Sequence, residues 1–249
     1  MTDAILCACL TGGGDNEVAK TALVPVAGGI ESVLTRIDGV TIGVADLAGG
    51  IAAYRKIGFE VDGRGVARTE GARLELTRGK EGLQSIALAS DDHAADSARP
   101  GTDYVKLVQP GNAPASRHPN GVLRIERTYI AVTDLKAAVE RYAQALGVAP
   151  KMERGTVINA DMAIFQLGPN GFGLAQPVGP GVCAEALKRR GPGPFQVLYR
   201  TSSMDAAAKW IADHGLPPPA RGIRNTGEQA MLVLPEHACG VYIGFVGMP

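Results

Sequence analysis

Polar side chains able to bind an anion fall at alternate positions of three short, partly β-branched stretches in the second half of the sequence. In a β-strand, alternate residues point to the same face, so the members of one stretch share a surface. Two guanidinium groups on such a surface suit a carboxylate or a phosphate, because their planar forks form bidentate hydrogen bonds. Tyrosine and glutamine would add neutral groups that orient a ligand. The polar residues are Arg127 and Tyr129 in the first stretch, Gln196 and Arg200 in the second and Tyr242 in the third, and the apolar Leu198 shares the face of Gln196 and Arg200.

The two arginines also have acidic residues near them in the sequence or along the same strands. Ordinary ion pairs would join Arg127 to Glu126 or Asp161, and Arg200 to Asp205. Such pairs would use the guanidinium groups for structure and leave less of them for a ligand. The sequence therefore leaves both interpretations open.

Histidine and cysteine, the usual ligands of transition metals, are few and scattered. A metal site needs three or four N, O or S ligands that converge on one point. The histidines fall in segments expected to be turns or helix ends, and no His or Cys pair elsewhere matches the Cys-x-Cys near the start. We expect Cys7 and Cys9 to be two buried or mobile thiols, and we expect no disulfide framework. The residues concerned are His93, His118, His214 and His237, and Cys7, Cys9, Cys183 and Cys239.

Composition excludes general disorder and argues against nucleic-acid and membrane partners. Of the 249 residues, 45% are hydrophobic and 20% are charged, which is enough apolar material for a real core. Lys plus Arg and Asp plus Glu both number 25, so no net charge attracts nucleic acid or an anionic membrane. No apolar run approaches the ~18 residues of a membrane span. The first residues lack a basic segment and a convincing cleavage site, so a cytoplasmic location is expected.

The elements that would position the polar side chains recur along the chain. Residues 39–47 and 127–135 each form a strand-like stretch that ends on Asp-Leu. Asp at that point is a good helix N-cap, and apolar residues follow it with helical spacing. A glycine closes each helix, where a left-handed residue is favoured. The matched pairs are Ile42/Ile130, Val44/Val132, Asp46/Asp134, Leu47/Leu135, Tyr54/Tyr142 and Gly58/Gly147.

Two further copies of this unit are visible. A third opens at Gln196, with Ser202 or Ser203 as the helix cap and Gly215 as its stop, and a fourth, eroded copy opens at Gln84 and keeps little helix. A Pro-, Gly- and Asn-rich stretch separates the two halves. We expect an N-terminal extension (1–35), a degenerate first module (36–110), a linker (111–123) and a second module (124–249).

Four strand–helix–strand units in two pairs, best marked by Val-x-Asp-Leu at the end of an opening strand, resemble the vicinal oxygen chelate superfamily. This superfamily contains glyoxalases, bleomycin-resistance proteins and extradiol dioxygenases. The resemblance covers roughly residues 37–247 and is best over 124–247. It implies an α+β fold in which tandem βαβββ units pair into two curved mixed sheets, with helices on the outer faces and a cup where ligands bind.

The resemblance also implies where a metal would bind: at the first residue of each opening strand and in the last strand of each unit. These positions lack the carboxylates and imidazoles that would hold a metal. Two are glutamines, and each stands alone in its half. We therefore expect neither a metal nor another cofactor. The positions are Gly39, Gln84, Arg127 and Gln196 in the opening strands and Lys106, Ala175 and Gly244 in the last strands.

On this fold, the alternating polar residues of the second half would face the cup. His118 begins a His-Pro-Asn-Gly turn just before the opening strand, which could place its imidazole at the rim as an acid or base. A turn kept for its geometry explains Pro, Asn and Gly equally well. The candidates are His118, Tyr129 and Tyr242 for catalysis and Arg127, Gln196, Leu198 and Arg200 for substrate binding.

Three functions fit these expectations. The first is a metal-independent isomerase or lyase that acts on a small anionic metabolite in the cup of the second module. The second is a non-catalytic protein that binds and sequesters a small molecule, and the third is a metal-dependent lyase or ring-cleaving dioxygenase whose ligands are misaligned. In each case the partner is a small molecule, a carboxylate or another anion, and a homodimer is left open.

Overall fold

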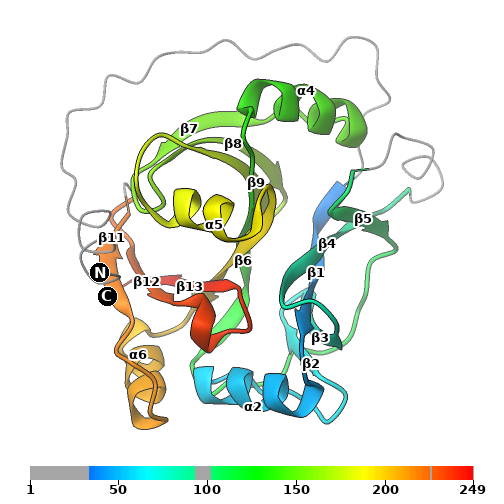
Figure 1. Ribbon diagram of the computed structural model, residues 1–249. Helices are drawn as coiled ribbons and strands as arrows, with labels where there is room; N and C mark the ends of the chain where they lie inside the picture. The colour runs from blue at the N-terminus through cyan, green and yellow to red at the C-terminus, as the bar shows by residue number, and fades with distance from the viewer. Residues whose placement is uncertain (1–33, 93–101, 225, 249) are drawn as a thin grey trace.

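The computed structural model describes residues 34–92, 102–224 and 226–248, which form two β-sheets and four α-helices (Figure 1). The proposed N-terminal extension lies almost wholly outside these residues, as do His93, Cys7 and Cys9. The first sheet has the order β2-β3-β1-β4-β5. Its strands are β1 (Leu34–Val44), β2 (Val66–Thr69), β3 (Ala72–Arg78), β4 (Gly82–Ser90) and β5 (Val105–Val108).

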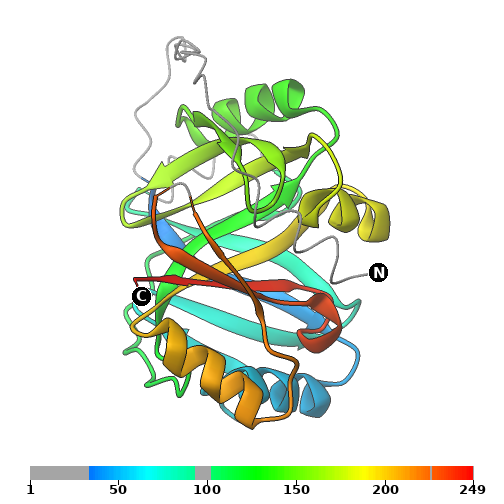
Figure 2. The same ribbon diagram turned by 90° about the vertical axis from the view of Figure 1, so that its left-hand side faces the viewer.

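The second sheet has eight strands in the order β11-β12-β13-β10-β6-β9-β8-β7. It curls strongly, as Figure 2 shows. The first four strands in the chain are β6 (Val122–Ala131), β7 (Lys151–Gly155), β8 (Ala160–Leu167) and β9 (Asn170–Pro177). The other four are β10 (Gly193–Thr201), β11 (Ala220–Ile223), β12 (Gln229–Val233) and β13 (Tyr242–Gly247).

Strand pairing shows that both sheets have the same design. In the second sheet β6 and β10 are antiparallel neighbours at the centre, and each has a parallel partner, β9 or β13. In the first sheet β1 and β4 take the central places, with β3 and β5 as their parallel partners. The α+β architecture of paired units in two curved mixed sheets is therefore confirmed. The eroded helix between β4 and β5 falls largely on residues 93–101, outside the described residues.

Helix caps confirm the sequence repeat. In α2 (Leu47–Ile57) the Asp46 carboxylate accepts from the Gly49 amide at 2.7 Å, and α2 ends at Gly58 with φ 100°. In α4 (Leu135–Leu146) the Asp134 carboxylate accepts from an amide at 3.0 Å, and α4 ends at Gly147 with φ 64°. Of the two serines considered, it is Ser203 that caps α6 (Met204–Asp213).

Replacing Asp134 by alanine should lower the free energy of unfolding by about 1 kcal/mol, because the first turn of α4 loses its side-chain acceptor. Urea denaturation measures the change. Glu140→Ala, at an exposed position of the same helix, is the matched control and should change stability by no more than about 0.5 kcal/mol. Equal losses in the two variants would mean that the cap contributes nothing specific.

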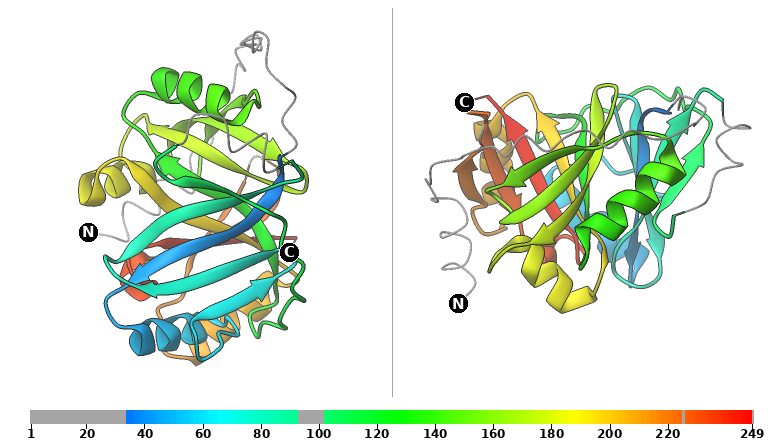
Figure 3. Two further views of the ribbon diagram at one scale, coloured as in Figure 1. Left: turned by 90° about the vertical axis from the view of Figure 1, so that its right-hand side faces the viewer. Right: turned by 90° about the horizontal axis from the view of Figure 1, so that it is seen from above.

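The two sheets stack face to face, as the opposite views of Figure 2 and of the left panel of Figure 3 show. Helices α2, α4 and α6 pack with both sheets in one large core. The fourth helix, α5 (Val182–Arg190), departs from the expected outer position, because it packs on the other, concave face of the second sheet. Among the described residues, no helix combines the length and apolarity that crossing a membrane would require.

We propose to divide the chain as the sequence suggests, into a first module (36–110), a linker (111–123) and a second module (124–249). The first sheet lies within residues 34–108 and the second within 122–247. On this division, the concave face of the second sheet belongs to the second module alone.

Candidate ligand-binding cup

The concave face of the second sheet is a separate apolar surface, which we call the cup. The structure places Tyr129, Leu198 and Tyr242 on it, whereas Ile130 and Val197 pack in the large core on the other face. The alternation of residues along the predicted strands therefore assigns these side chains to the correct faces of the second sheet. The strand residues of the cup are Tyr129, Ala131, Ala160, Met162, Ile164, Ala175, Phe195, Leu198, Ala230, Leu232, Tyr242 and Val246.

Helix α5 covers part of the cup. Val182, Cys183 and Ala186 lie in the same apolar cluster as the cup residues, and the Cys183 sulfur lies 3.5 Å from the Ala175 carbonyl oxygen. Burial raises the pKa of the Cys183 thiol to about 12, so the thiol stays neutral at physiological pH. Cys183 therefore acts as a small apolar side chain that packs α5 against the cup.

Two glycines let side chains approach the floor of the cup closely. A Cβ atom on Gly173 would lie 2.7 Å from Ile164 Cδ1 and 3.0 Å from a ring carbon of Tyr129. A Cβ atom on Gly244 would lie 2.6 Å from Leu198 Cδ1. Larger residues at these two places would force the floor apart, so the glycines are part of its packing.

Strand register corrects one expected metal position. Tyr129 pairs with Gln196 and Arg127 pairs with Leu198, which relates β6 and β10 by a local twofold. Gly173 lies beside Tyr129, and Gly244 lies beside Leu198, so these two glycines are equivalent and Ala175 is two residues further along. An equal count along the chain from the turn glycines Gly171 and Gly240 leads to Ala175 and Gly244. This count fails because β8 and β9 join by a tight turn, whereas a 3₁₀ turn (Pro235–His237) joins β12 to β13.

The residues at the metal-ligand positions that the sequence resemblance implies do not fit a metal ion. Arg127 is a cation, Gln196 offers an amide, and Gly173 and Gly244 offer no side chain at all. Within the part of the chain that the structure describes, no group of three His, Cys, Asp or Glu side chains is placed to hold a metal.

Arg127 lies at the edge of the cup and pairs with a carboxylate that the sequence did not indicate. Its Nη1 donates to Glu153 Oε1 at 2.9 Å, and its guanidinium also interacts with the Tyr129 hydroxyl. Burial opposes the charge on Arg127, but Tyr129 and Glu153 outweigh it and raise the pKa of the guanidinium. The expected partners were wrong: Asp161 pairs with Arg154 instead.

Arg200 is held by two carboxylates rather than by Asp205, which pairs with Arg221. Its Nε and Nη2 each donate to Glu126 at 2.8 Å, and Nη2 also donates to Glu228 at 2.8 Å. These groups form a chain of charges, the charge network, made of Arg124, Glu126, Arg200, Glu228 and Arg224.

The charge network stabilises its acids in the ionised form. Burial raises the pKa of Glu126 and of Glu228, but the hydrogen bonds and charge of Arg200 outweigh burial and hold both pKa values below the usual range. The register between β6 and β10 shifts between Leu198 and Tyr199. Glu126 therefore has no paired residue on β10. The guanidinium of Arg200 is thus engaged in the fold, which weakens its candidacy as a substrate-binding group.

Gln196 and Tyr242 lie next to each other in the cup, on paired positions of β10 and β13. Gln196 is only 3% exposed, and its Oε1 has no hydrogen-bond partner among the described residues. The Arg189 guanidinium of α5 lies 5.2 Å from the ring centre of Tyr242. Burial raises the pKa of the Tyr242 hydroxyl despite this cation, so the hydroxyl is a neutral donor.

His118 is not at the rim of the cup. The imidazole is 4% exposed, its Nδ1 accepts from the Glu60 amide at 3.0 Å, and its Nε2 lies 3.0 Å from the Arg68 carbonyl oxygen, to which it donates. It packs edge-on against Phe59 of the first module. The turn precedes β6 as expected. It directs the His118 side chain into the junction of the modules, where both imidazole nitrogens form hydrogen bonds with backbone groups.

The burial of His118 predicts a pH dependence of stability. Desolvation is the main cause that lowers its pKa in the folded protein. The unfolded chain therefore takes up the proton more readily, and stability is lost as the pH falls below the unfolded value of about 6.5 toward the lower folded pKa. Urea denaturation between about pH 7 and pH 5 should show this decline, and His118→Gln should flatten it. His214→Gln, at an exposed helix end, is the control; the same flattening there would contradict the assignment.

Comparisons with known proteins agree with this geometry. Residues 127–233 match the family model of the glyoxalase/bleomycin resistance protein/dioxygenase superfamily. A triple mutant of 4-hydroxymandelate synthase from Streptomyces coelicolor has a similar fold, with a TM-score of 0.64 and 14% identity over 86% of this chain and 92% of that one. Methylmalonyl-CoA epimerase from Mycobacterium tuberculosis aligns with 52% of this chain and 90% of its own, with a TM-score of 0.46 and 25% identity. No curated protein matches the sequence.

Proposed function

We propose, from the premise that the chain belongs to the glyoxalase/bleomycin resistance protein/dioxygenase superfamily, that its second module binds a small anionic molecule in the cup. Gln196 carries this proposal: it pairs with the cup residue Tyr129, and its amide oxygen is buried and unpartnered among the described residues. A buried acceptor without a partner costs about 1–3 kcal/mol, which a donor group on a ligand would recover. Arg127 donates to Glu153 from Nη1, and its other N–H groups would bind the anionic group of the ligand.

Ligand entry would involve α5, because this helix packs over the cup. Its last residue is followed by Gly191, whose φ of 76° is favourable for glycine, and the N-terminal end has no side-chain cap. We propose that α5 shifts as the ligand enters and that Leu198 and the tyrosines contact the apolar part of the ligand.

For the reaction we propose a metal-independent isomerase or lyase. The Tyr129 hydroxyl beside Arg127 and the Tyr242 hydroxyl beside Arg189 lie in an apolar surface, and burial raises the pKa of the Tyr242 hydroxyl. Hydroxyl donors of this kind stabilise negative charge that develops on a substrate oxygen. His118 is not included, because both of its nitrogens bind backbone. A cytoplasmic location belongs to this proposal.

Non-catalytic binding is the second candidate, and one observation favours it. Among the described residues, Glu126, Glu153 and Glu228 are the acids that contact the cup arginines, and each is ion-paired. Of the described acids that contact Arg127 and Arg200, none is therefore free to remove a proton from carbon. Deuterium exchange at the carbon next to the carboxylate of a bound ligand distinguishes the two: exchange that Tyr242→Phe abolishes supports catalysis, and binding without exchange supports sequestration.

The purified chain should contain far less than one equivalent of Fe, Mn, Ni or Zn. The physical reason is that cationic Arg127 repels a divalent ion and that Gly173 and Gly244 supply no ligand. Elemental analysis after purification without chelators measures this. About one equivalent of metal that is lost in Gln196→Ala would contradict metal independence and favour a metal-dependent lyase or dioxygenase.

A further inference from the structure

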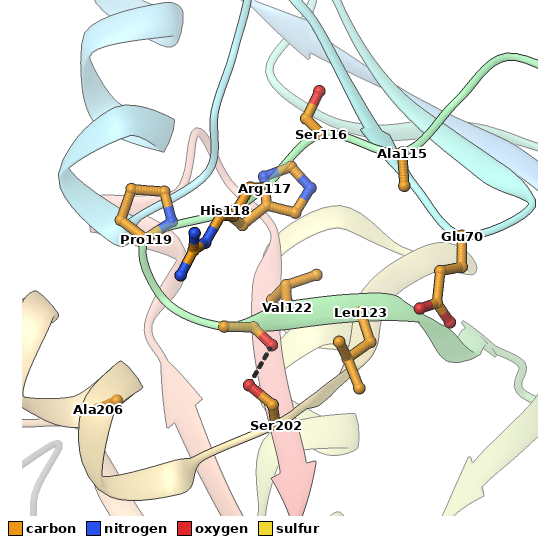
Figure 4. A pocket seen from close by; sticks show the side chains of 11 residues that line it. Glu70, Ala115, Ser116, Arg117, His118, Pro119, Val122, Leu123, Ser202 and Ala206 are labelled. Carbon is orange, nitrogen blue, oxygen red and sulfur yellow. Dashed lines mark hydrogen bonds between the residues drawn. The ribbon is translucent and has the colours of Figure 1, made fainter.

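The two modules contact each other at two places that are held in different ways. At the first, the end of the linker runs into β6, and Ser202 donates to the Gly121 carbonyl oxygen at 3.2 Å (Figure 4). The buried Asn120 side chain donates from Nδ2 to the Ile57 carbonyl oxygen at 3.1 Å. The Asn120 carbonyl oxygen accepts from Thr201 Oγ1 at 2.9 Å. The linker is therefore fixed to both modules at this place.

At the second place the first module contacts the end of α5, the helix that covers the cup. The Tyr104 hydroxyl, just before β5, donates to the Pro192 carbonyl oxygen at 3.1 Å. The Tyr104 ring also lies against Gly193, where a Cβ atom would be 3.3 Å from it. Because Pro192 is two residues beyond α5, this hydrogen bond holds the segment that joins the helix to β10.

Arg190, the last residue of α5, fills a notch on the first module. The place that a Cβ atom on Gly82 would occupy is taken by the Arg190 guanidinium. Arg190 Nη1 is buried and has no hydrogen-bond partner among the described residues. Burial and the charge of Arg189 lower the pKa of Arg190, and the opposing effects of Tyr104 and Glu81 are smaller. A buried N–H group without an acceptor costs free energy, so this contact opposes the closed position of α5.

The other end of α5 is held within the second module. The Asn159 side chain donates from Nδ2 to the Pro180 carbonyl oxygen at 2.7 Å, and the Val178 amide donates to the Asn159 carbonyl oxygen at 3.2 Å. The Cys183 amide, in the first turn, donates to the Ile158 carbonyl oxygen at 3.4 Å. These bonds tie the start of the helix to the connection between β7 and β8. Movement of α5 away from the cup therefore requires release of its C-terminal end.

We propose that the first module sets how often α5 uncovers the cup. Tyr104 holds the C-terminal end of the helix closed, and the unpartnered Nη1 of Arg190 favours its release, so the two contacts oppose each other. When this end is released, α5 pivots on its N-terminal end and exposes the cup residues beneath it. The inference rests on the proposed function, which makes α5 the lid of a ligand site, and it assigns the regulation of that site to the first module.

Labelling of the Cys183 thiol measures the opening, because this side chain is 0% exposed beneath α5 and reacts only in the open form. The full chain is treated with iodoacetamide under native conditions, without a ligand, and peptide mass spectrometry gives the rate at Cys183. Tyr104→Phe should react about 2- to 10-fold faster than the wild type, because one hydrogen bond to the lid is lost. Arg190→Met should react about 3- to 10-fold more slowly, because its side chain has no unpaired N–H group to bury.

The matched control is Arg141→Ala. Arg141 belongs to α4 and pairs with Asp103, next to Tyr104, so its loss should leave the labelling of Cys183 unchanged. An unchanged rate in either Tyr104→Phe or Arg190→Met would overturn the proposal. Faster labelling in both variants would also overturn it, because general destabilisation produces that result. The assay needs no ligand, so a cup that binds no carboxylate would refute the proposed function and leave these rates unaffected.

Discussion

Replacing Arg200 by alanine should lower the free energy of unfolding by about 3 kcal/mol. Arg200 is the only residue that contacts both Glu126 and Glu228 within the described charge network. The three side chains are 16–22% exposed, so the two carboxylates would remain largely desolvated after the guanidinium is removed. Removing one partner of a buried ion pair costs about 3–5 kcal/mol, and partial exposure reduces this somewhat.

Urea denaturation of Arg200→Ala measures the loss, with Arg221→Ala as the matched control. Arg221 forms one exposed ion pair with Asp205, so its removal should cost no more than about 1 kcal/mol. A loss below 1 kcal/mol in Arg200→Ala would show that the charge network contributes little to the fold.

The same variant should respond less to acid. Arg200 lowers the pKa of Glu126 and Glu228 in the folded protein. Their contribution to stability is therefore present above the unfolded pKa of about 4.5 and is lost as the pH falls through the folded values. Arg200→Ala removes most of this contribution, so its stability should decline less between about pH 5 and pH 3.

Replacing Arg127 by alanine should weaken the binding of a carboxylate ligand roughly ten- to a hundredfold. A hydrogen bond to a charged group contributes about 1.5–3 kcal/mol, and the guanidinium interacts with the Tyr129 hydroxyl in the cup. Arg127→Lys should recover little of the affinity, because an ammonium group cannot reproduce a bidentate fork.

Isothermal titration with a carboxylate that binds the wild-type chain measures the effect. Arg221→Ala is again the control and should bind normally, since Arg221 lies outside the cup. The melting temperature of Arg127→Ala must stay close to that of the wild type for the comparison to hold. Wild-type affinity in a correctly folded Arg127→Ala protein would mean that the anion is bound elsewhere.

The fold could be predicted because its signals are local. The caps Asp46 and Asp134 and the closing glycines Gly58 and Gly147 act within one turn of their own helices, so spacing alone identifies them. The side of the sheet on which a helix packs is not local. Helix α5 has an apolar stripe like those of α4 and α6, and nothing in such a stripe indicates that it fills the concave face.

The candidate site could be predicted in part for the same reason. Strand alternation places Tyr129, Leu198 and Tyr242 on one face, because their directions follow from the backbone. Ion-pair partners depend on strand order and register. Glu153 reaches Arg127 from β7, which is three strands away from β6 across the sheet, and no spacing rule relates the two positions.

His118 shows the same limit at a turn. Asn-Gly and the preceding proline predict the turn correctly, but the direction of the imidazole depends on the first module, which supplies the Glu60 amide and the Arg68 carbonyl. The residue that packs against the imidazole, Phe59, is distant from His118 in the sequence, so no local pattern indicates this buried position.

The most direct test of the cup is a screen of small carboxylates against the ¹⁵N-labelled full chain. The reporters are the side-chain amide of Gln196 and the backbone amides of Tyr129, Leu198 and Gly244. We expect at least one carboxylate to shift all four saturably and its primary-amide counterpart, which lacks the charge, to bind at least tenfold more weakly. Carboxylates that leave these reporters unmoved, or amide counterparts that bind equally well, would contradict an anion-binding cup.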